Sequence, residues 1–264
     1  MFPYFEFLGR TIGLYQILSL CGIFAAGIYS CKIARKAGHD DNDIIFLLLF
    51  SAIGVFTGGH FLYGLVNYSY IIYAINNFER LNSVRKIIDT IIVIFGGSVF
   101  YGGLIGGIFA GHLYTGKNKK YLIDIVTPAI PLFHFFGRIG CFLGGCCFGI
   151  ESFIGFTTSH GIIEEANGVQ RFPVQLLEVV FNFFLFILLA IFRKKGLFKD
   201  RLLHIYVLMY STGRFFIEFL RGDDVRGKWF LFSTSQIISM VLFSIIVTSS
   251  LALKLSRRKA GSWV

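Results

Sequence analysis

The sequence predicts an all-α polytopic membrane protein, folded as a single integral membrane domain over residues 1–264. Of its 264 residues, 55% are hydrophobic, 17% are aromatic and only 15% are charged, whereas soluble domains carry about a quarter charged residues. The mean hydropathy is +0.70. Thirty glycines agree with this class, because glycine is frequent in membrane helices and costly in soluble ones. A water-soluble fold would expose much of this apolar surface, so the bilayer is the better solvent for it.

Seven stretches are long and apolar enough to cross a bilayer as helices of about 20 residues. They cover residues 12–32, 43–67, 88–113, 121–149, 173–192, 202–220 and 233–253. The fourth contains Pro128 and Pro131, which predict a kink or a break. Its last third is rich in glycine and cysteine and is a candidate for a non-helical segment lining a cavity. The two longer loops, 68–87 and 150–172, are candidates for short amphipathic helices on the membrane surface.

Lysine and arginine residues between these stretches predict the orientation, because cytoplasmic loops are enriched in them. Loops 32–42, 114–120 and 193–201 and the C-terminal tail hold 15 basic residues, and the other side holds 8. The N-terminus is therefore predicted outside and the C-terminus in the cytoplasm. We interpret the net charge of +10 as this topology signal, and expect no nucleic-acid partner.

Two basic residues, Arg138 and Arg214, fall within predicted spans. A charge there costs roughly 2.5–3.5 kcal/mol and by default marks function or a buried pair. Arg214 and Glu218 lie four residues apart on one helix face, where they can pair, and Arg221 lies near the same face. His134 precedes Arg138 by one turn. The planar guanidinium group suits bidentate binding of a phosphate.

The stretch 134–149 combines Arg138 with glycines, including Gly137 and Gly140, that let a ligand or a neighbouring helix approach closely. It also holds Cys141, Cys146 and Cys147. These cysteines lack the usual spacing of metal ligands, so no metal is predicted, and we interpret them as small buried hydrophobes. A cysteine nucleophile at position 141 or 146 is the alternative.

These stretches resemble motifs of the prolipoprotein diacylglyceryl transferase family. They occur in the same order as in the family, and the resemblance covers most of the chain. The family signature is close to Gly-Arg-x-Gly-Asn-Phe-x-Asn-x-Glu-x-x-Gly, and Gly137 to Gly140, Phe142 and Gly149 match it. Further stretches similar to family motifs are 101–106, 124–132, 171–178, 210–221 with Asp223, and 235–239.

The resemblance implies transfer of a diacylglyceryl group from phosphatidylglycerol to the lipobox cysteine of a prolipoprotein, at the outer leaflet of a bacterial inner membrane. A thioether forms, glycerol phosphate leaves, and no metal or other cofactor is implied. Arg138, Arg214 and Arg221 would clamp the phosphate. Gln175 and Glu178 would orient the head group or the arginines. The other implied site residues are Tyr101 and His134 as catalytic residues, and Gly102, Gly103, Gly137, Gly140, Cys141 and Cys146 as substrate-binding residues.

The sequence departs from the family pattern in the acid–base half of the site. Tyr101 stands where the family usually has a functional histidine, and His60 stands where it has an arginine. The two signature asparagines and the glutamate are replaced by Cys141, Gly144 and Cys146. His134 is a candidate to replace the base. Two alternatives follow: a transferase with another acceptor or a cysteine intermediate, and a phospholipid-binding or transport protein without catalysis.

Overall fold

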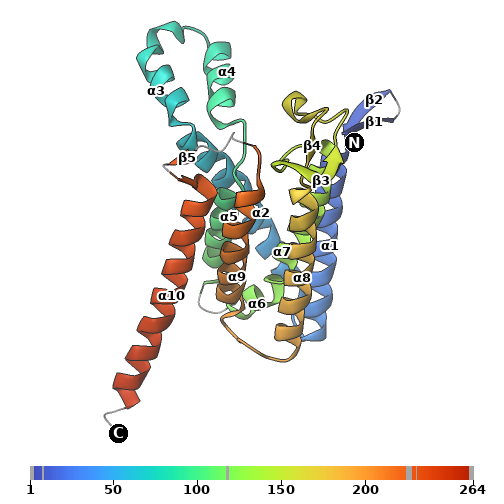
Figure 1. Cartoon of the computed structure of the whole chain (residues 1–264). Helices are drawn as coiled ribbons and strands as arrows, with labels where there is room; N and C mark the ends of the chain where they lie inside the picture. The colour runs from blue at the N-terminus through green and yellow to red at the C-terminus, as the bar shows by residue number, and fades with distance from the viewer. Residues whose placement is uncertain (1–2, 8, 117–118, 224–227, 230, 262–264) are drawn as a thin grey trace. The chain divides into compact units, whose positions relative to one another are not determined.

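The computed structural model describes residues 3–7, 9–116, 119–223, 228–229 and 231–261. These residues are mostly helical, which confirms the predicted class in outline (Figure 1). Met1–Ile33 with Asp124–Val264 form one compact unit, and Ala34–Ile123 form the other. That both belong to a single integral membrane domain stays a prediction. Lys117 and Arg226, which we counted for the orientation, lie outside the described residues.

Among the described residues, five helical segments are long and apolar enough to cross a membrane. A sixth arises if α4 (Val84–Phe95) and α5 (Phe100–Thr115), bent by 95°, count as one span. The helix α9 (Leu202–Ile217) has 16 residues and falls short. The predicted count of seven therefore stays a prediction. The five segments are α1 (Leu14–Lys36), α2 (Asp41–Val66), α6 (Tyr121–Val126) with α7 (Ala129–Gly144), α8 (Val174–Lys194) and the start of α10 (Thr234–Gly261).

The predicted break in the fourth stretch is confirmed and falls between α6 and α7, at residues 127–128. Pro131 lies in the first turn of α7, where a missing N–H group costs no helix hydrogen bond. The helix then continues to Gly144. Non-helical backbone therefore begins only at Gly145, later than the glycine-rich composition suggested.

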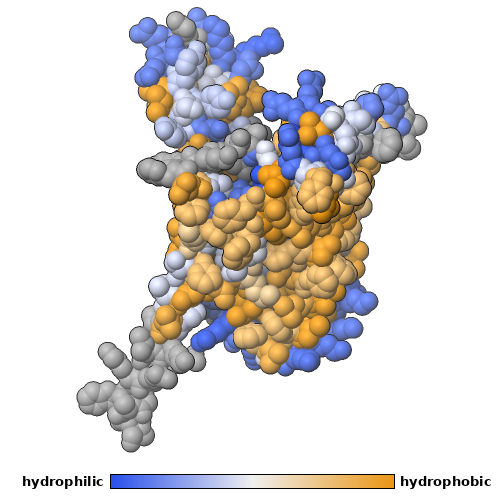
Figure 2. Space-filling view, in the orientation of Figure 1, coloured by the Kyte–Doolittle hydropathy of each residue, from blue (hydrophilic) through white to orange (hydrophobic). Residues whose placement is uncertain are grey.

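In the first unit, α7 packs against α1 and α8, and α9 packs against α8 and α10. A short 3-10 helix, η3 (Glu218–Leu220), extends α9. Figure 2 shows hydrophobic side chains over the visible face of α1 and α8, with hydrophilic ones towards the helix ends. This distribution fits a bilayer around the helices.

Asp124 holds the start of α9 from a distant part of the chain. Its Oδ2 accepts the backbone N–H of Asp200 at 2.6 Å, and its Oδ1 accepts that of Leu202 at 3.3 Å. The first N–H groups of a helix lack partners within the helix, so this carboxylate acts as an N-terminal cap. The aspartate of the predicted family motif therefore has a structural role.

Three antiparallel strand pairs are described. They are β1 (Tyr4–Phe7) with β2 (Arg10–Gly13), β3 (Glu151–Thr157) with β4 (Gln170–Arg171), and β5 (Lys228–Trp229) with β6 (Phe232–Ser233). The helix expected in loop 150–172 is thus wrong, since this loop forms β3, β4 and the single turn η2 (Glu164–Ala166). The aromatic and β-branched residues of β3 favour a strand. The other loop does form a helix, α3 (Tyr68–Asn76), followed by η1 (Phe78–Arg80).

In the second unit, α2 and α5 pack with their backbones in close contact. Gly54 and Gly58 of α2 face Gly106 and Gly102 of α5, so that a Cβ on any of them would collide with a backbone carbonyl opposite. Two small residues spaced by four on each helix are a known means of close helix packing in membranes. Gly103 also faces α2, where its Cβ would lie 3.2 Å from Val55.

The stretch 88–113 was predicted as one helix, and this is wrong, because it is broken between α4 and α5. Gly96 and Gly97 occupy the break and weaken the helix there. Backbone groups freed by the break find partners on α2. Val99 N donates to Gly59 O at 3.1 Å, and His60 Nδ1 donates to Phe95 O at 2.6 Å.

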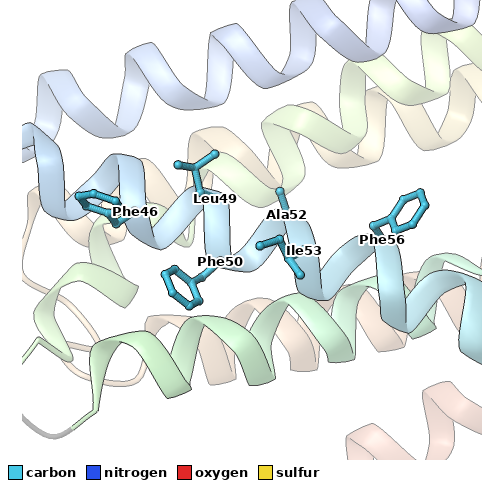
Figure 3. Close-up of a pocket in the computed structure, with 6 residues that line it drawn as sticks. All are labelled: Phe46, Leu49, Phe50, Ala52, Ile53 and Phe56. Atoms are coloured by element: carbon cyan, nitrogen blue, oxygen red, sulfur yellow. The ribbon is translucent and has the colours of Figure 1, made fainter.

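An apolar pocket runs along α2, lined by side chains from that helix alone (Figure 3). Phe56 at one end is 67% exposed. The pocket offers no polar group, which is the property of a surface that lipid chains cover. Its lining residues are Phe46, Leu49, Phe50, Ala52, Ile53 and Phe56.

Candidate active site

Glu178, near the start of α8, is the centre of a buried ion cluster in the first unit. The residue is only 1% exposed. Its Oε1 contacts Nη1 of Arg214 at 2.7 Å and Nη1 of Arg221 at 3.3 Å. Its Oε2 pairs with Nε of Arg138. The three arginines of the predicted phosphate clamp therefore meet on one carboxylate, from α7, α9 and the segment after η3.

His134 lies one turn before Arg138 on α7, and both side chains are buried. Arg138 Nε donates to His134 Nε2 at 3.1 Å. Because a guanidinium group has no acceptor, Nε2 must supply the lone pair, and the proton of the neutral ring sits on Nδ1. His134 thereby positions Arg138. Its action as a general base stays a prediction.

Two further carboxylates hold the arginines from the outside of the cluster. Glu218 pairs with Nη2 of Arg214, which confirms the pair predicted from their spacing. Asp223 accepts from Nε and Nη2 of Arg221 at 2.8 and 2.6 Å, a bidentate contact. Together with Glu178, three carboxylates balance three arginines. Ion clusters without net charge are the form in which charges are tolerated at membrane depth.

The backbone around Arg221 is fixed by the end of the predicted signature. Gly149 forms an antiparallel bridge with Arg221, and Gly222 N donates to Phe148 O at 3.0 Å. A Cβ on Gly149 would lie 3.0 Å from Leu220 O. The last glycine of the signature is therefore needed for close approach of two backbones, and it supports the third arginine of the cluster.

Gln175 joins the turn after α7 to the start of α8. Its Nε2 donates to the carbonyl oxygen of Cys146 at 2.8 Å. The side chain is buried, as is Glu178 one turn later. Gln175 thus holds the cysteine-containing turn next to the ion cluster. Its predicted contact with a lipid head group stays a prediction.

The thiol of Cys146 lies beyond the end of α7 and is half-buried. Its hydrogen bond with Cys141 lowers its pKa, but the hydrogen bond with Cys147 and burial outweigh this and raise the pKa to about 11. The thiol is therefore protonated at neutral pH. A nucleophilic cysteine needs the thiolate, so this environment does not favour Cys146 as a nucleophile.

The two glycines on either side of Arg138 differ in their surroundings. A Cβ on Gly140 would lie 3.0 Å from the ring of Tyr15 and 3.2 Å from its Cα, so Gly140 allows α7 to pack against α1. A Cβ on Gly137 would meet no atom within 4 Å. Open space therefore lies on the face of α7 that Gly137 presents. Substrate binding by either glycine stays a prediction.

Tyr101, Gly102 and Gly103 lie on α5 in the second unit. Gly102 and Gly103 are accounted for by the packing of α5 against α2 described above. The ring of Tyr101 lies edge-on to that of Phe100, with centroids 6.1 Å apart. The predicted roles of these three residues in catalysis and substrate binding stay predictions.

Ser233 and Gln236 also support the cluster, and the sequence reasoning gave them no role. Ser233 Oγ donates to Glu218 Oε1 at 2.9 Å. Ser233 N donates to Gln236 Oε1 at 2.9 Å, and Gln236 N donates to Ser233 Oγ at 3.2 Å. This reciprocal pattern is a capping box at the start of α10. A serine followed three residues later by glutamine before an apolar run was the available signal.

Comparison with known proteins decides the family. The model of the prolipoprotein diacylglyceryl transferase family matches residues 3–251. This chain belongs to that family.

Curated relatives agree with this assignment over most of the length of this chain. A phosphatidylglycerol–prolipoprotein diacylglyceryl transferase of Clostridium tetani is 35% identical, covering 92% of this chain and 93% of the relative. A second one, of Clostridium perfringens, is 34% identical and covers 90% and 89%. One of Clostridioides difficile is 33% identical and covers 84% and 83%. The resemblance inferred from the motifs is therefore confirmed.

Proposed function

We propose that this chain transfers the diacylglyceryl group of phosphatidylglycerol to the lipobox cysteine thiol of a prolipoprotein. Its relatives carry the name of this activity. The observation that carries the proposal is the convergence of Arg138, Arg214 and Arg221 on Glu178. This cluster supplies fixed cationic donors where a lipid phosphate has to be bound.

The proposed reaction develops charge on the phosphate. The acceptor sulfur forms a bond to the glyceryl carbon that bears the phosphate, while the bond from that carbon to the phosphate oxygen breaks. Glycerol phosphate leaves with the electron pair, and the proton of the acceptor thiol passes to the leaving phosphate or to solvent. Donors that are fixed before the reaction stabilise such charge without rearranging. Glu178 is the positioning residue that fixes them.

Arg138 is the arginine that we assign to direct phosphate contact. Its contacts with His134 and Glu178 both use Nε. The two Nη groups of a guanidinium carry four further N–H donors in a plane, which suits two phosphate oxygens. The preceding residue, Gly137, faces open space on α7. The other two arginines are held by carboxylates through their Nη groups.

We place the protein in a bacterial inner membrane, with seven crossings, the N-terminus outside and the C-terminus in the cytoplasm. The 15 to 8 distribution of basic residues supports this orientation. Arg138 and Arg214 lie in the C-terminal halves of α7 and α9, and Arg221 follows η3. All three arginines are then in the outer half of the membrane. That is where a prolipoprotein cysteine emerges after export.

A release assay tests the proposal. Purified protein is mixed with phosphatidylglycerol labelled in its head group, with a lipobox peptide, with the same peptide carrying serine for cysteine, or with no peptide. We expect release of labelled glycerol phosphate with the cysteine peptide alone. Equal release in all three mixtures would contradict the proposed acceptor.

One alternative is a phospholipid-binding protein that performs no transfer, because Tyr101 stands at the position of the usual family histidine. Binding of phosphatidylglycerol with no release in any mixture would favour it. A transferase with a cysteine intermediate is the other alternative. Full activity of a protein with serine at positions 141, 146 and 147 would exclude it.

A further inference from the structure

Asn182 places a buried amide group in the apolar middle of α8. Its side chain is 0% exposed, and it lies between Phe181 and Phe183 in the sequence. An amide group that is removed from water is costly unless its polar atoms are hydrogen-bonded. Helices in membranes also use asparagine to form hydrogen bonds with a neighbouring helix. In the described part of the chain, the Asn182 side chain has two partners, and both belong to the candidate active site.

The first partner is the backbone of Glu178, one turn earlier on the same helix. Asn182 Nδ2 donates to Glu178 O at 2.8 Å. This bond orients the amide group, because its nitrogen is a donor and its oxygen is an acceptor. The Oδ1 atom of Asn182, which is also buried, is therefore the atom that remains for a second partner.

The second partner is the ring of His134 on α7, which forms a hydrogen bond with the Asn182 side chain. Arg138 Nε already donates to His134 Nε2 at 3.1 Å. The proton of the neutral ring therefore sits on Nδ1, which donates to the remaining Oδ1 of Asn182. The helices α7 and α8 pack against each other (Figure 1), so this bond crosses a helix contact.

These contacts close a loop that begins and ends at Glu178. The backbone of Glu178 holds the Asn182 amide group, and the amide group holds the ring of His134. The ring accepts from Arg138 Nε, and the same Nε pairs with the Glu178 carboxylate. The ring of Tyr210 on α9 also lies close to that of His134, with centroids 5.5 Å apart. The loop therefore fixes Arg138 through Nε alone.

We propose that Asn182 is a positioning residue for Arg138 and acts through the orientation and tautomer of His134. The partner of one ring nitrogen commonly decides which nitrogen carries the proton. Without the acceptor oxygen of Asn182, the ring can turn over or move its proton. Arg138 Nε then meets an N–H group instead of a lone pair and loses its position. The inference rests on the proposed function in one respect, the contact of Arg138 with the lipid phosphate.

The same arrangement gives His134 a role other than that of the general base. A general base has to lie within hydrogen-bonding distance of the proton that it removes. Both nitrogens of the His134 ring bond to protein groups instead. His134 therefore transmits position from Asn182 to Arg138, and the proton of the acceptor thiol does not pass to it.

The release assay measures the effect of Asn182 on the reaction. Asn182→Leu keeps the approximate size of the side chain and removes the amide group. It should lower release of glycerol phosphate by about 10²-fold, the cost of a group misplaced by about 1 Å. Ser30→Ala is the matched control, because Ser30 is also 0% exposed and donates to Ala26 O, four residues earlier on its helix. Unchanged release by Asn182→Leu, or an equal loss in the control, overturns the proposal.

A double-mutant cycle separates positioning through His134 from a general loss of structure. His134→Gln keeps an acceptor for Arg138 Nε but removes the ring through which Asn182 acts. In the His134→Gln background, Asn182→Leu should lower release by a further factor of less than about two. Losses that multiply in full indicate independent sites and overturn the proposal.

The tautomer of His134 is measured without catalysis, by nitrogen NMR of the full chain with isotope-labelled histidine in detergent. Absence from the spectrum of His134→Gln assigns the signals. We expect a proton on Nδ1 and none on Nε2 in the wild-type protein, and a mixture of both forms in folded Asn182→Leu. A proton on Nε2 in the wild-type protein, or one identical form in both proteins, overturns the proposal. The expected tautomers together with no release by the wild-type protein contradict the transferase and leave the positioning of Arg138.

Discussion

At the scale of single residues, the ion cluster joins two requirements that oppose each other. Charged side chains in the membrane need partners of opposite charge. A lipid phosphate, in contrast, needs N–H donors that are not already bonded to carboxylates of the protein. Glu178 contacts all three arginines, so its loss would leave several cations uncompensated. Arg138 shares its carboxylate with two other arginines, so its loss leaves no carboxylate alone. The two kinds of substitution should therefore differ in their effect on stability.

Glu178→Gln should destabilise the protein by about 3–5 kcal/mol, because it removes the buried negative charge that all three arginines share. It should also reduce transfer, since the arginines lose their fixed positions. Glu151→Gln is the matched control, since that carboxylate is 73% exposed and lies 3.8 Å from Arg171. We expect the control to change stability by less than about 1 kcal/mol. Thermal unfolding in detergent measures both, and equal stability of the two variants would contradict the role of Glu178.

Arg138→Ala should reduce release of glycerol phosphate by about 10²–10³-fold, the usual effect of removing a donor to developing charge. The folded protein should remain, because Glu178 keeps Arg214 and Arg221. Arg35→Ala removes an arginine with a 69% exposed side chain and serves as the control, with unchanged release. Normal activity of Arg138→Ala in a reconstituted assay would refute the assignment of this residue.

Gly137→Ala and Gly140→Ala separate space for substrate from space for packing. The new methyl group meets no atom within 4 Å at position 137, but lies 3.0 Å from Tyr15 at position 140. Gly137→Ala should leave the melting temperature unchanged or higher, and should raise KM for phosphatidylglycerol if the lipid occupies that space. Gly140→Ala should lower the melting temperature. A stable Gly137→Ala enzyme with unaltered KM would exclude lipid from this position.

Part of the site was predictable from the sequence because its geometry is local. The pairing of Arg214 with Glu218 follows from a spacing of four on one helix, and the structure has it. The contacts of Glu178 join segments 36 and 43 residues apart. No helical spacing reveals such contacts, and the choice between orienting a head group and orienting arginines stayed open until the fold brought them together.

At the scale of helices and strands, hydrophobic runs located the long apolar helices but not the break between α4 and α5. Gly96 and Gly97 lie inside an apolar run, and an average of hydropathy over the run conceals the loss of helix propensity there. Loop 150–172 was misread because its apolar residues fit a helix face as well as a short strand. The strand pair β3 and β4 is decided by pairing between segments distant in the sequence, which a local pattern does not contain.

The contact between α2 and α5 gives a prediction at this scale. Gly58→Ala places a methyl group against the carbonyl of Gly102 and 3.0 Å from the Cα of Gly106. Overpacking of this kind typically costs about 1–3 kcal/mol. Gly27→Ala on α1 is the control, because its methyl group meets no atom within 4 Å. A loss of thermal stability in Gly58→Ala alone is expected, and equal melting of both variants would contradict the close packing.

At the scale of the whole molecule, the number of crossings depends in part on α9. Its 16 residues span about 24 Å at 1.5 Å per residue. The three residues of η3 add about 6 Å at 2.0 Å per residue. The total of about 30 Å matches the hydrocarbon core of a bilayer. Together with η3, therefore, α9 is long enough to cross, and the arginines at its end lie near the opposite surface.

The orientation is tested by reporters at three positions. With seven crossings and the N-terminus outside, reporters at Gly38, at Gly196 and after the C-terminus should all be cytoplasmic, because the basic loops lie there. A reporter at His160, between β3 and η2, should be outside. If α9 and η3 did not cross, the reporter at Gly196 would remain cytoplasmic while that at the C-terminus would move outside. The pair of reporters at Gly196 and the C-terminus thus isolates the crossing by α9. An outside location for both would instead invert the orientation and place the arginine cluster in the leaflet opposite to the exported prolipoprotein.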